Sequence, residues 1–222
     1  MSVKILISGE SNSGKTTLTK SLNPSTTLVI SHDGKNFPFP IPHVNVDTFD
    51  TSSELTTLIT AKIEAFHGKL GHYPTTIVID SVSKIFDTLM DSMNTKHKGF
   101  TIYSELNKEI HHFTDYIQNT LIASEMNVVL ISHAIYDSET TNYNLVGKGD
   151  FQKRGGFLSE VDNAIFVEKK ANKRIVHHKS TRFPARSVLP EIPDSLPMDD
   201  YSLSTHITEL EKLKDDVVGF LI

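Results

Sequence analysis

Apolar residues in this chain form short uninterrupted runs, separated by longer segments in which apolar and polar positions alternate with helical spacing. Continuous apolar runs are typical of strands buried on both faces of a parallel sheet, and amphipathic segments between them are typical of covering helices. Strands are expected at residues 3–8, 27–31, 43–46, 75–80, 127–132, 163–168 and 174–177. Helices are expected near residues 15–22, 52–67, 82–93, 103–125 and 204–217.

This alternation predicts an α/β fold in which a mainly parallel sheet is flanked by helices. The last two strands are separated only by "KKANK", so a β-hairpin is expected at the carboxyl-terminal edge of the sheet. With 222 residues, 38% of them hydrophobic, the chain suits one core domain with a short appendage. Residues 1–190 are expected to form the core, and residues 191–222 a Pro-rich connection with a C-terminal helix or tail.

Composition excludes several classes of function. The chain contains no cysteine, so disulfides and cysteine-based zinc sites are excluded. No apolar run approaches the length of a membrane span, and the first apolar run lacks the features of a signal peptide. We therefore expect a cytoplasmic protein without a membrane partner. The net charge of −5 means that any binding of nucleic acid must depend on a local basic patch.

The first predicted strand leads directly into "GESNSGKTT", which fits the pattern G-x-x-x-x-G-K-[ST] before a predicted helix. Glycines allow the backbone to turn tightly and to direct successive N–H groups at a phosphate. Lys15 would contact the β- and γ-phosphates, and the Thr16 hydroxyl would bind Mg²⁺. A Gly/Ser turn between strand and helix is the alternative. The expected ATP-binding residues are Gly9, Glu10, Ser11, Asn12, Ser13, Gly14, Lys15, Thr16 and Thr17.

A second part of an ATP site is predicted by "TTIVIDS", a buried strand that ends in Asp80. In nucleoside triphosphatases with such a loop, an aspartate at the carboxyl end of the neighbouring strand holds the magnesium ion through water. Asp80 and Thr16 are therefore the expected metal-binding residues. The alternative is a solvated aspartate that merely ends a strand.

Two further polar residues follow predicted strands at the edge where ligands bind in α/β sheets. Asp33, in "SHDGK", is a candidate for activating the attacking water, because a carboxylate is ionised at neutral pH. A plain Asp-Gly turn is the alternative. His133, after "VVLIS", is a candidate sensor of the γ-phosphate, and a strand-end histidine with a structural hydrogen bond is the alternative.

Four segments together resemble one family. "GESNSGKTT", "IVIDSVSKIF", "VVLISHA" and "IVHHKSTRFPAR" follow the order and spacing of RecA-type recombinase ATPases, and they are most similar to short phage-encoded RecA-like single-strand annealing proteins. The resemblance covers residues 3 to about 190. It implies a RecA-like P-loop NTPase fold, an ATPase core over residues 1–190, and the host cytoplasm as location if a phage encodes the chain.

The resemblance also implies two mobile loops that face DNA. The first matches "MNTKHKGFTIY", with Lys96, Lys98 and Phe100. The second spans residues 136–160, is expected to lack regular structure, and carries Lys148, Phe151, Lys153, Arg154 and Phe157. Cations neutralise backbone phosphates and aromatic rings stack on unpaired bases, which agrees with this interpretation. A solvated flexible insertion is the alternative for the second loop.

In "HHKSTRF", the resemblance places cations that reach the γ-phosphate of a neighbouring subunit. Lys179 and Arg182 would act there in trans, where positive charge stabilises the transition state. Hydrolysis would then depend on assembly into a ring or short filament. Two surface cations on an edge strand are the alternative.

The leading hypothesis is a weak, DNA- and assembly-dependent ATPase that binds single-stranded DNA and promotes annealing in homologous recombination. Its expected partners are single-stranded DNA, further copies of itself and a single-strand-binding protein. One alternative is a P-loop small-molecule kinase, although the candidate lid holds only one arginine, Arg154. Another is an ATP-dependent switch that recruits a replication partner.

Overall fold

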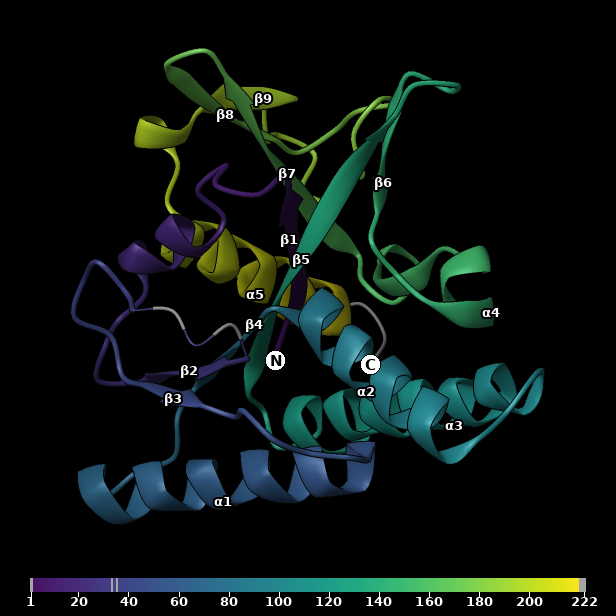
Figure 1. The fold of residues 1–222 in the computed structure, drawn as a ribbon. Helices are drawn as coiled ribbons and strands as arrows, with labels where there is room; N and C mark the ends of the chain where they lie inside the picture. Colours follow the sequence, from purple (N-terminus) through teal and green to yellow (C-terminus); the bar gives the residue numbers. More distant parts are fainter. Residues whose placement is uncertain (1, 33, 35, 220–222) are drawn as a thin grey trace.

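The computed structural model describes residues 2–32, 34 and 36–219, with side chains described up to residue 215. In this part of the chain, one sheet contains the strands β1 (Lys4–Gly9), β2 (Thr27–Ser31), β3 (His43–Asn45), β4 (Thr76–Asp80), β5 (Asn127–Asp137), β6 (Asn142–Leu145), β7 (Asn163–Lys170), β8 (Lys173–His177) and β9 (Ser195–Pro197). The strand order is β3-β2-β4-β5-β1-β7-β8-β9, and β6 pairs with β5 (Figure 1).

The strands from β3 to β7 in this order are parallel to one another, whereas β7, β8 and β9 are antiparallel. The predicted α/β fold with a mainly parallel sheet is therefore confirmed, and so is the hairpin of β7 and β8. However, β8 does not form the edge of the sheet, because β9 pairs with its other side.

Helices cover both faces of the sheet (Figure 1). They are α1 (Ser52–Leu70), α2 (Val82–Lys96), α3 (Thr101–Tyr116), the π-helix η2 (Ile117–Ile122), α4 (Gly149–Lys153), α5 (Leu203–Gly219) and the 3-10 helices η1 (Thr16–Ser21), η3 (Gly156–Leu158) and η4 (Met198–Asp200). Helix α1 begins where the Thr51 hydroxyl accepts a hydrogen bond from Glu54 N, and it ends at Gly71, whose φ is +79°. None of the helices within residues 2–32 and 36–219 is both long and apolar enough to cross a membrane.

Alternate residues of the strands belong to two separate cores. In β1, Leu6 packs in the core beneath α1, α2 and α3. Its neighbours Ile5 and Ile7 pack in the opposite core, which Leu203 and Ile207 of α5 close. Because both strand faces are buried in this way, the strands appear in the sequence as continuous apolar runs.

Several predicted elements differ in the structure. Residues 15–22 form the short 3-10 helix η1, and the helix expected over residues 103–125 is divided between α3 and η2. Strand β5 continues to Asp137 because it forms a hairpin with β6. The expectation that residues 136–160 lack regular structure is wrong, since they contain β6, α4 and η3. The Pro-rich segment contributes β9 and η4.

Candidate nucleotide site

The predicted phosphate loop joins β1 to η1 at the carboxyl edge of the sheet. Its backbone has positive φ at Gly9 (+152°), Asn12 (+60°) and Gly14 (+105°). A Cβ on Gly9 would lie 2.5 Å from the Val167 carbonyl oxygen, so only glycine fits there. The glycines of the motif are thus required by the shape of the loop itself.

Two side chains at the end of the loop have partners that suit a magnesium–triphosphate site. The Lys15 ammonium donates hydrogen bonds to the carbonyl oxygens of Gly9 (2.9 Å) and Glu10 (2.7 Å) and is almost completely buried. The Thr16 hydroxyl donates to Asp80 Oδ2 at 2.6 Å, and this carboxylate is also buried. The interaction brings together the two residues that the sequence predicts as metal-binding.

The position of Asp80 corrects one expectation. Strand β4 does not neighbour β1, because β5 lies between them. Gly9 pairs with His133 on β5, and Ile131 on β5 pairs with Asp80. The Thr16–Asp80 hydrogen bond therefore joins residues on the two sides of β5, the strand between β1 and β4.

His133 lies within β5 instead of ending it, because the strand continues into the hairpin. The side chain is half-buried and borders the phosphate loop, as a γ-phosphate sensor requires. Its backbone N–H donates to the Ser83 hydroxyl (3.3 Å), and its carbonyl oxygen accepts from Val146 N (2.9 Å). The role of His133 as a sensor stays a prediction.

A pocket of about 240 Å³ lies over the loop, lined by Asn12, residues 14–17, Asp80, His133 and Arg174. Arg174 is an exposed residue of β8 that sequence reasoning missed. Arg174 reaches the loop because Val176 pairs with Val167, which pairs with Gly9, and Arg174 lies two residues beyond Val176 towards the loop. No local sequence signal could have found Arg174, because its position depends on the pairing of the hairpin with β1.

The residues at this site fit a nucleotide with Mg²⁺. Ser13 Oγ of the phosphate loop is buried without a hydrogen-bond partner among the described residues, as expected for a hydroxyl whose partner is a bound phosphate. Mg²⁺ prefers a few protein oxygens combined with water and substrate phosphates. Thr16 and Asp80 supply such oxygens, and no group of three or more acidic or histidine side chains within the described part of the chain competes as a metal site.

The fold and the loop define a P-loop nucleoside triphosphatase domain. The chain matches the family model of an AAA domain over residues 1–187 and therefore belongs to this family. Nucleotide binding follows from this membership and from the loop geometry. Among curated proteins, no sequence matches the chain.

The other predicted catalytic residues lie in different places. Asp33 is outside the described residues. Lys179 donates to the carbonyl oxygens of Pro190 (3.3 Å) and Ile192 (3.4 Å), so its own chain holds the ammonium. The guanidinium of Arg182 is exposed and lies 5.9 Å from the ring centroid of Tyr143.

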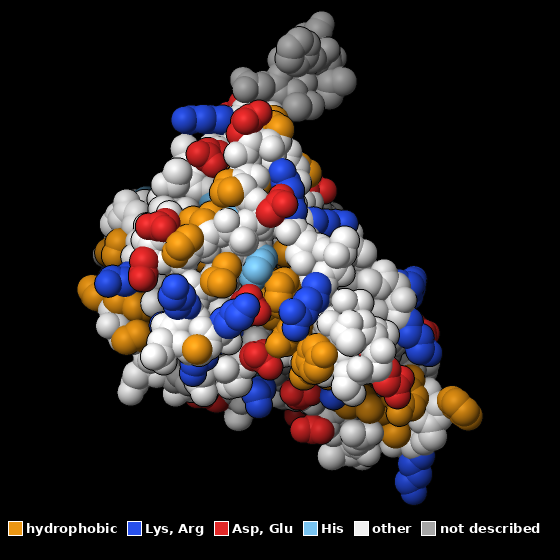
Figure 2. Space-filling view, turned by 90° about the horizontal axis from the view of Figure 1, so that it is seen from above, with side chains coloured by type: hydrophobic (Ala, Val, Ile, Leu, Met, Phe, Trp, Pro, Cys, Tyr) orange, Lys and Arg blue, Asp and Glu red, His pale blue; other side chains and the backbone are white. Residues whose placement is uncertain are grey.

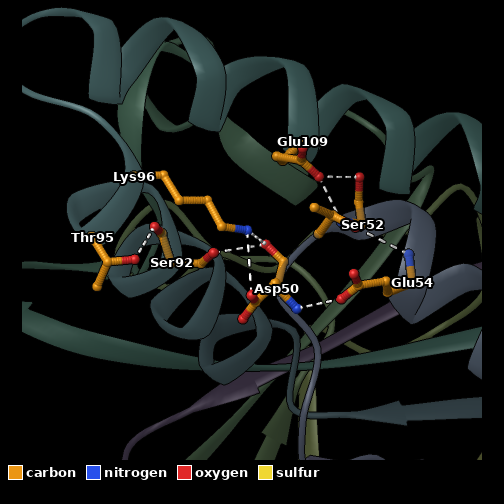
Figure 3. A network of polar contacts seen from close by, with 8 residues as sticks. Asp50, Ser52, Glu54, Ser92, Thr95, Lys96 and Glu109 are labelled. Atoms are coloured by element: carbon orange, nitrogen blue, oxygen red, sulfur yellow. Dashed lines mark hydrogen bonds and ion pairs between the residues drawn. The ribbon is translucent and has the colours of Figure 1, made fainter.

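The first predicted DNA segment connects α2 and α3 at the right of Figure 1. Phe100 is 93% exposed there, next to the exposed Lys98. Lys96 instead forms an ion pair with Asp50 (3.4 Å) in a polar network where Glu109 accepts hydrogen bonds from the backbone and hydroxyl of Ser52 (Figure 3). Lys96 therefore joins α2 to the residue just before α1, and its ammonium already has an acidic partner.

The second predicted DNA segment is folded. Phe151 and Phe157 are buried, and both rings pack against Phe86 of α2. The expectation that they stack on bases is corrected to a role in the core, because burying aromatic surface is what holds α4 and η3 onto α2. Lys148 pairs with Asp87 at 3.0 Å.

Two cations of this segment remain at the surface. Lys153 pairs with Asp150 (3.3 Å) but is 81% exposed, and Arg154 is also exposed. Seen from above, Lys and Arg side chains are interspersed with acidic ones and form no continuous basic face (Figure 2). Any binding of DNA on this side would depend on a few cations.

Proposed function

We propose that this protein is an ATP-hydrolysing, RecA-like P-loop protein that binds single-stranded DNA and promotes strand annealing in homologous recombination. ATP with Mg²⁺ binds at the phosphate loop, with Lys15, Thr16 and Asp80 as the main side chains. The polar contacts of these residues support this part of the proposal. The proposed setting is the cytoplasm of a phage-infected host, with a single-strand-binding protein as a further partner.

The path of β5 is the observation that carries the link between ATP and DNA. His133 lies level with Gly9, and the same strand continues to Asp137 and turns into β6. The hydrogen bond from Val146 N to the His133 carbonyl oxygen joins the end of this hairpin to the sensor position. A shift of His133 on binding the γ-phosphate would move the β5–β6 hairpin and the segment that follows it.

A second contact joins the phosphate loop to the hairpin. The pKa of Tyr143 on β6 is raised by burial and by the nearby Glu10 carboxylate. Glu10 belongs to the phosphate loop, so both strands of the hairpin lie near nucleotide-binding residues. This favours a hairpin whose position depends on nucleotide.

The proposed DNA surface consists of exposed residues on two neighbouring segments. Lys98 and Phe100 lie between α2 and α3, and Lys153 and Arg154 follow α4. The hydrogen bonds between Asn107 on α3 and Asp150 on α4 join the helix that follows the first segment to the helix that precedes Lys153 and Arg154. Cations for phosphates and an exposed ring for base stacking are the usual elements of a single-strand site.

We also propose that several copies of the chain assemble around the nucleotide. In a ring or short filament, Arg182 of one subunit would approach the triphosphate of the next, and Lys179 would support it. Arg182 is exposed, whereas Lys179 would have to leave its carbonyl partners. Size analysis with ATP–Mg²⁺ and a short oligonucleotide should show growth in mass that needs both ligands.

The function is tested by the fluorescence anisotropy of a labelled single-stranded oligonucleotide, titrated with protein in the presence and absence of ATP–Mg²⁺. We expect tighter binding with ATP–Mg²⁺. Lys15→Ala should abolish this gain, and His133→Ala should abolish it while ATP still binds. Lys20→Ala, an exposed cation at the end of η1, is the matched control and should behave as the unchanged protein. Negligible DNA binding in both states would disprove the proposal.

A further inference from the structure

A second cavity adjoins the phosphate loop. It lies between the beginning of β8 and the segment of β9 and η4, and its volume is about 590 Å³. We call it the β8–β9 cavity, lined by residues 172–175 and 195–199. Arg174 lines both this cavity and the pocket over the phosphate loop. The two spaces therefore meet at one side chain.

The wall of the β8–β9 cavity touches the phosphate loop directly. A Cβ on Gly14 would lie 3.1 Å from Arg174 Cδ and 3.2 Å from Met198 Sδ. These two side chains therefore pack against Gly14. The phosphate loop thus borders the wall of the cavity at this glycine.

The sheet order gives the direction in which a triphosphate would lie. Its metal-binding end is fixed by Asp80 on β4, which lies on one side of β1. Strands β7 and β8 lie on the other side of β1. A triphosphate bound along the loop with its γ end near Asp80 directs its other end towards β8 and the cavity.

We propose that the β8–β9 cavity holds the nucleoside part of the nucleotide, the base together with its ribose, and that Arg174 contacts the phosphates next to the ribose. This inference rests on the proposed binding of a nucleoside triphosphate at the loop. Nothing in the P-loop motif assigns the site, because the motif specifies phosphates and leaves the base undefined.

The chemistry of the lining suits a flat heteroaromatic ring. Ile175, Leu196 and Met198 offer apolar contacts, and the polarisable sulfur of Met198 packs well on aromatic faces. Asn172 presents both a donor and an acceptor to the edge of a base, and Asp199 accepts hydrogen bonds from ribose hydroxyls or exocyclic amines. Apolar walls with a few polar groups are typical of such sites.

Calorimetric titration with ATP–Mg²⁺ and with inorganic tripolyphosphate–Mg²⁺ separates the two parts of the site. Tripolyphosphate has no base, so it reports on the loop alone. We expect the unchanged protein to bind ATP more tightly than tripolyphosphate. Met198→Ala should weaken ATP binding by about tenfold and leave tripolyphosphate binding unchanged. Arg174→Ala should weaken the binding of both ligands, because it removes a cation beside the phosphates.

Met90→Ala, a half-buried methionine of α2 on the other face of the sheet, is the matched control and should bind both ligands normally. Equal affinity of the unchanged protein for ATP and tripolyphosphate would overturn the inference while phosphate binding at the loop survives. A loss in Met198→Ala that is the same for both ligands would also overturn it. If neither ligand binds the unchanged protein, the proposed function itself fails.

A photoaffinity experiment on the unchanged chain tests the same site without relying on the folding of variants. 8-Azido-ATP is photolysed with the protein and Mg²⁺, and labelled peptides are identified by mass spectrometry. Labels should fall within residues 172–175 or 195–199 and should disappear in excess ATP. Competable labels confined to other segments would overturn the inference.

Discussion

The Thr16 hydroxyl lies 2.6 Å from Asp80 Oδ2, although 64 residues separate the two positions in the chain. Asp80 is 5% exposed, and a buried carboxylate requires polar partners such as this hydroxyl. Both oxygens are ligands that Mg²⁺ prefers, so we propose that the pair forms the metal-binding side of the nucleotide site.

Asp80→Asn should remove the magnesium dependence of nucleotide binding. An amide is a weaker ligand for Mg²⁺ than a carboxylate, while its similar shape preserves the hydrogen bond with Thr16. We expect ATP affinity in Mg²⁺ to fall by about tenfold and to equal the affinity measured in EDTA. Calorimetric titration measures both values. Asp91→Asn, at an exposed position of α2, should retain the full difference between Mg²⁺ and EDTA.

The attachment of α5 should depend on pH. His206 of α5 and His178, which follows β8, are both buried, and burial lowers the pKa of each, that of His206 to about 4. The His206 ring nitrogen Nδ1 shares a hydrogen bond with the Tyr201 hydroxyl at 3.0 Å, and its Nε2 has no partner among the described residues. Within the described part of the chain, no hydrogen-bond acceptor stabilises a proton at that nitrogen.

The direction of the pH dependence of stability follows from the lower pKa of His206 in the folded state. The unfolded chain binds a proton to His206 below about pH 6.5, whereas the folded chain stays neutral down to about pH 4, so acid favours unfolding. The contribution of His206 to stability should be complete above the unfolded pKa. The free energy of unfolding should fall by up to about 1.4 kcal/mol for each pH unit between pH 6.5 and about pH 4, and His178 should act in the same direction.

Urea unfolding at several pH values measures this effect. His206→Leu should reduce the pH dependence below about pH 6.5, even if the variant is less stable at neutral pH. His111→Leu, at an exposed position of α3, should leave the pH dependence as it is. An identical slope in His206→Leu and in the unchanged protein would contradict the prediction.

Sequence reasoning identifies the residues of the site best where one segment carries the whole signal. The loop from Gly9 to Thr16 is such a segment, because spacing alone defines its geometry. Asp80 is also identified from its strand, but its distance from β1 is not, since strand order depends on tertiary packing. Arg174 is missed because its contact with Gly14 arises from the pairing of β8 with β7, which no local pattern records.

The region after β5 shows why other features of the fold could not be predicted from the sequence. A segment with cations, glycines and aromatic residues is typical both of a mobile DNA-binding loop and of an insertion with its own secondary structure, so composition does not distinguish the two. The packing of Phe151 and Phe157 against Phe86 shows that the segment is folded. This contact joins residues that are far apart in the chain, so the sequence does not reveal it. Tertiary burial thus overrides the expectation from local composition.

Phe151 and Phe100 should respond in opposite ways to truncation. Phe151 is buried against Phe86, so Phe151→Ala should cost about 3–5 kcal/mol of stability. Phe151→Leu retains apolar volume and should preserve both the fold and DNA affinity. Phe100 is 93% exposed, so Phe100→Ala should leave the melting temperature unchanged and weaken DNA binding. A loss of DNA affinity in Phe151→Leu with unchanged stability would restore the stacking role.

The cations after α4 should act through phosphates. Lys153 and Arg154 are exposed, and the ion pair of Lys153 with Asp150 is open to solvent, so it should contribute little to stability. In the double variant Lys153→Ala, Arg154→Ala, the free energy of unfolding should stay unchanged and binding of single-stranded DNA should weaken. Each lost phosphate contact should lower the slope of log affinity against log salt by about 0.7, the value for single strands.

Anisotropy titrations at several salt concentrations give this slope. Lys169→Ala with Lys170→Ala is the matched control, because these exposed cations at the end of β7 lie outside the proposed surface. It should keep both affinity and slope. If the double variant after α4 loses affinity but keeps the slope of the unchanged protein, Lys153 and Arg154 do not neutralise phosphates. If the control loses as much as the double variant, the binding is a general response to positive charge, and no defined DNA surface follows from this segment.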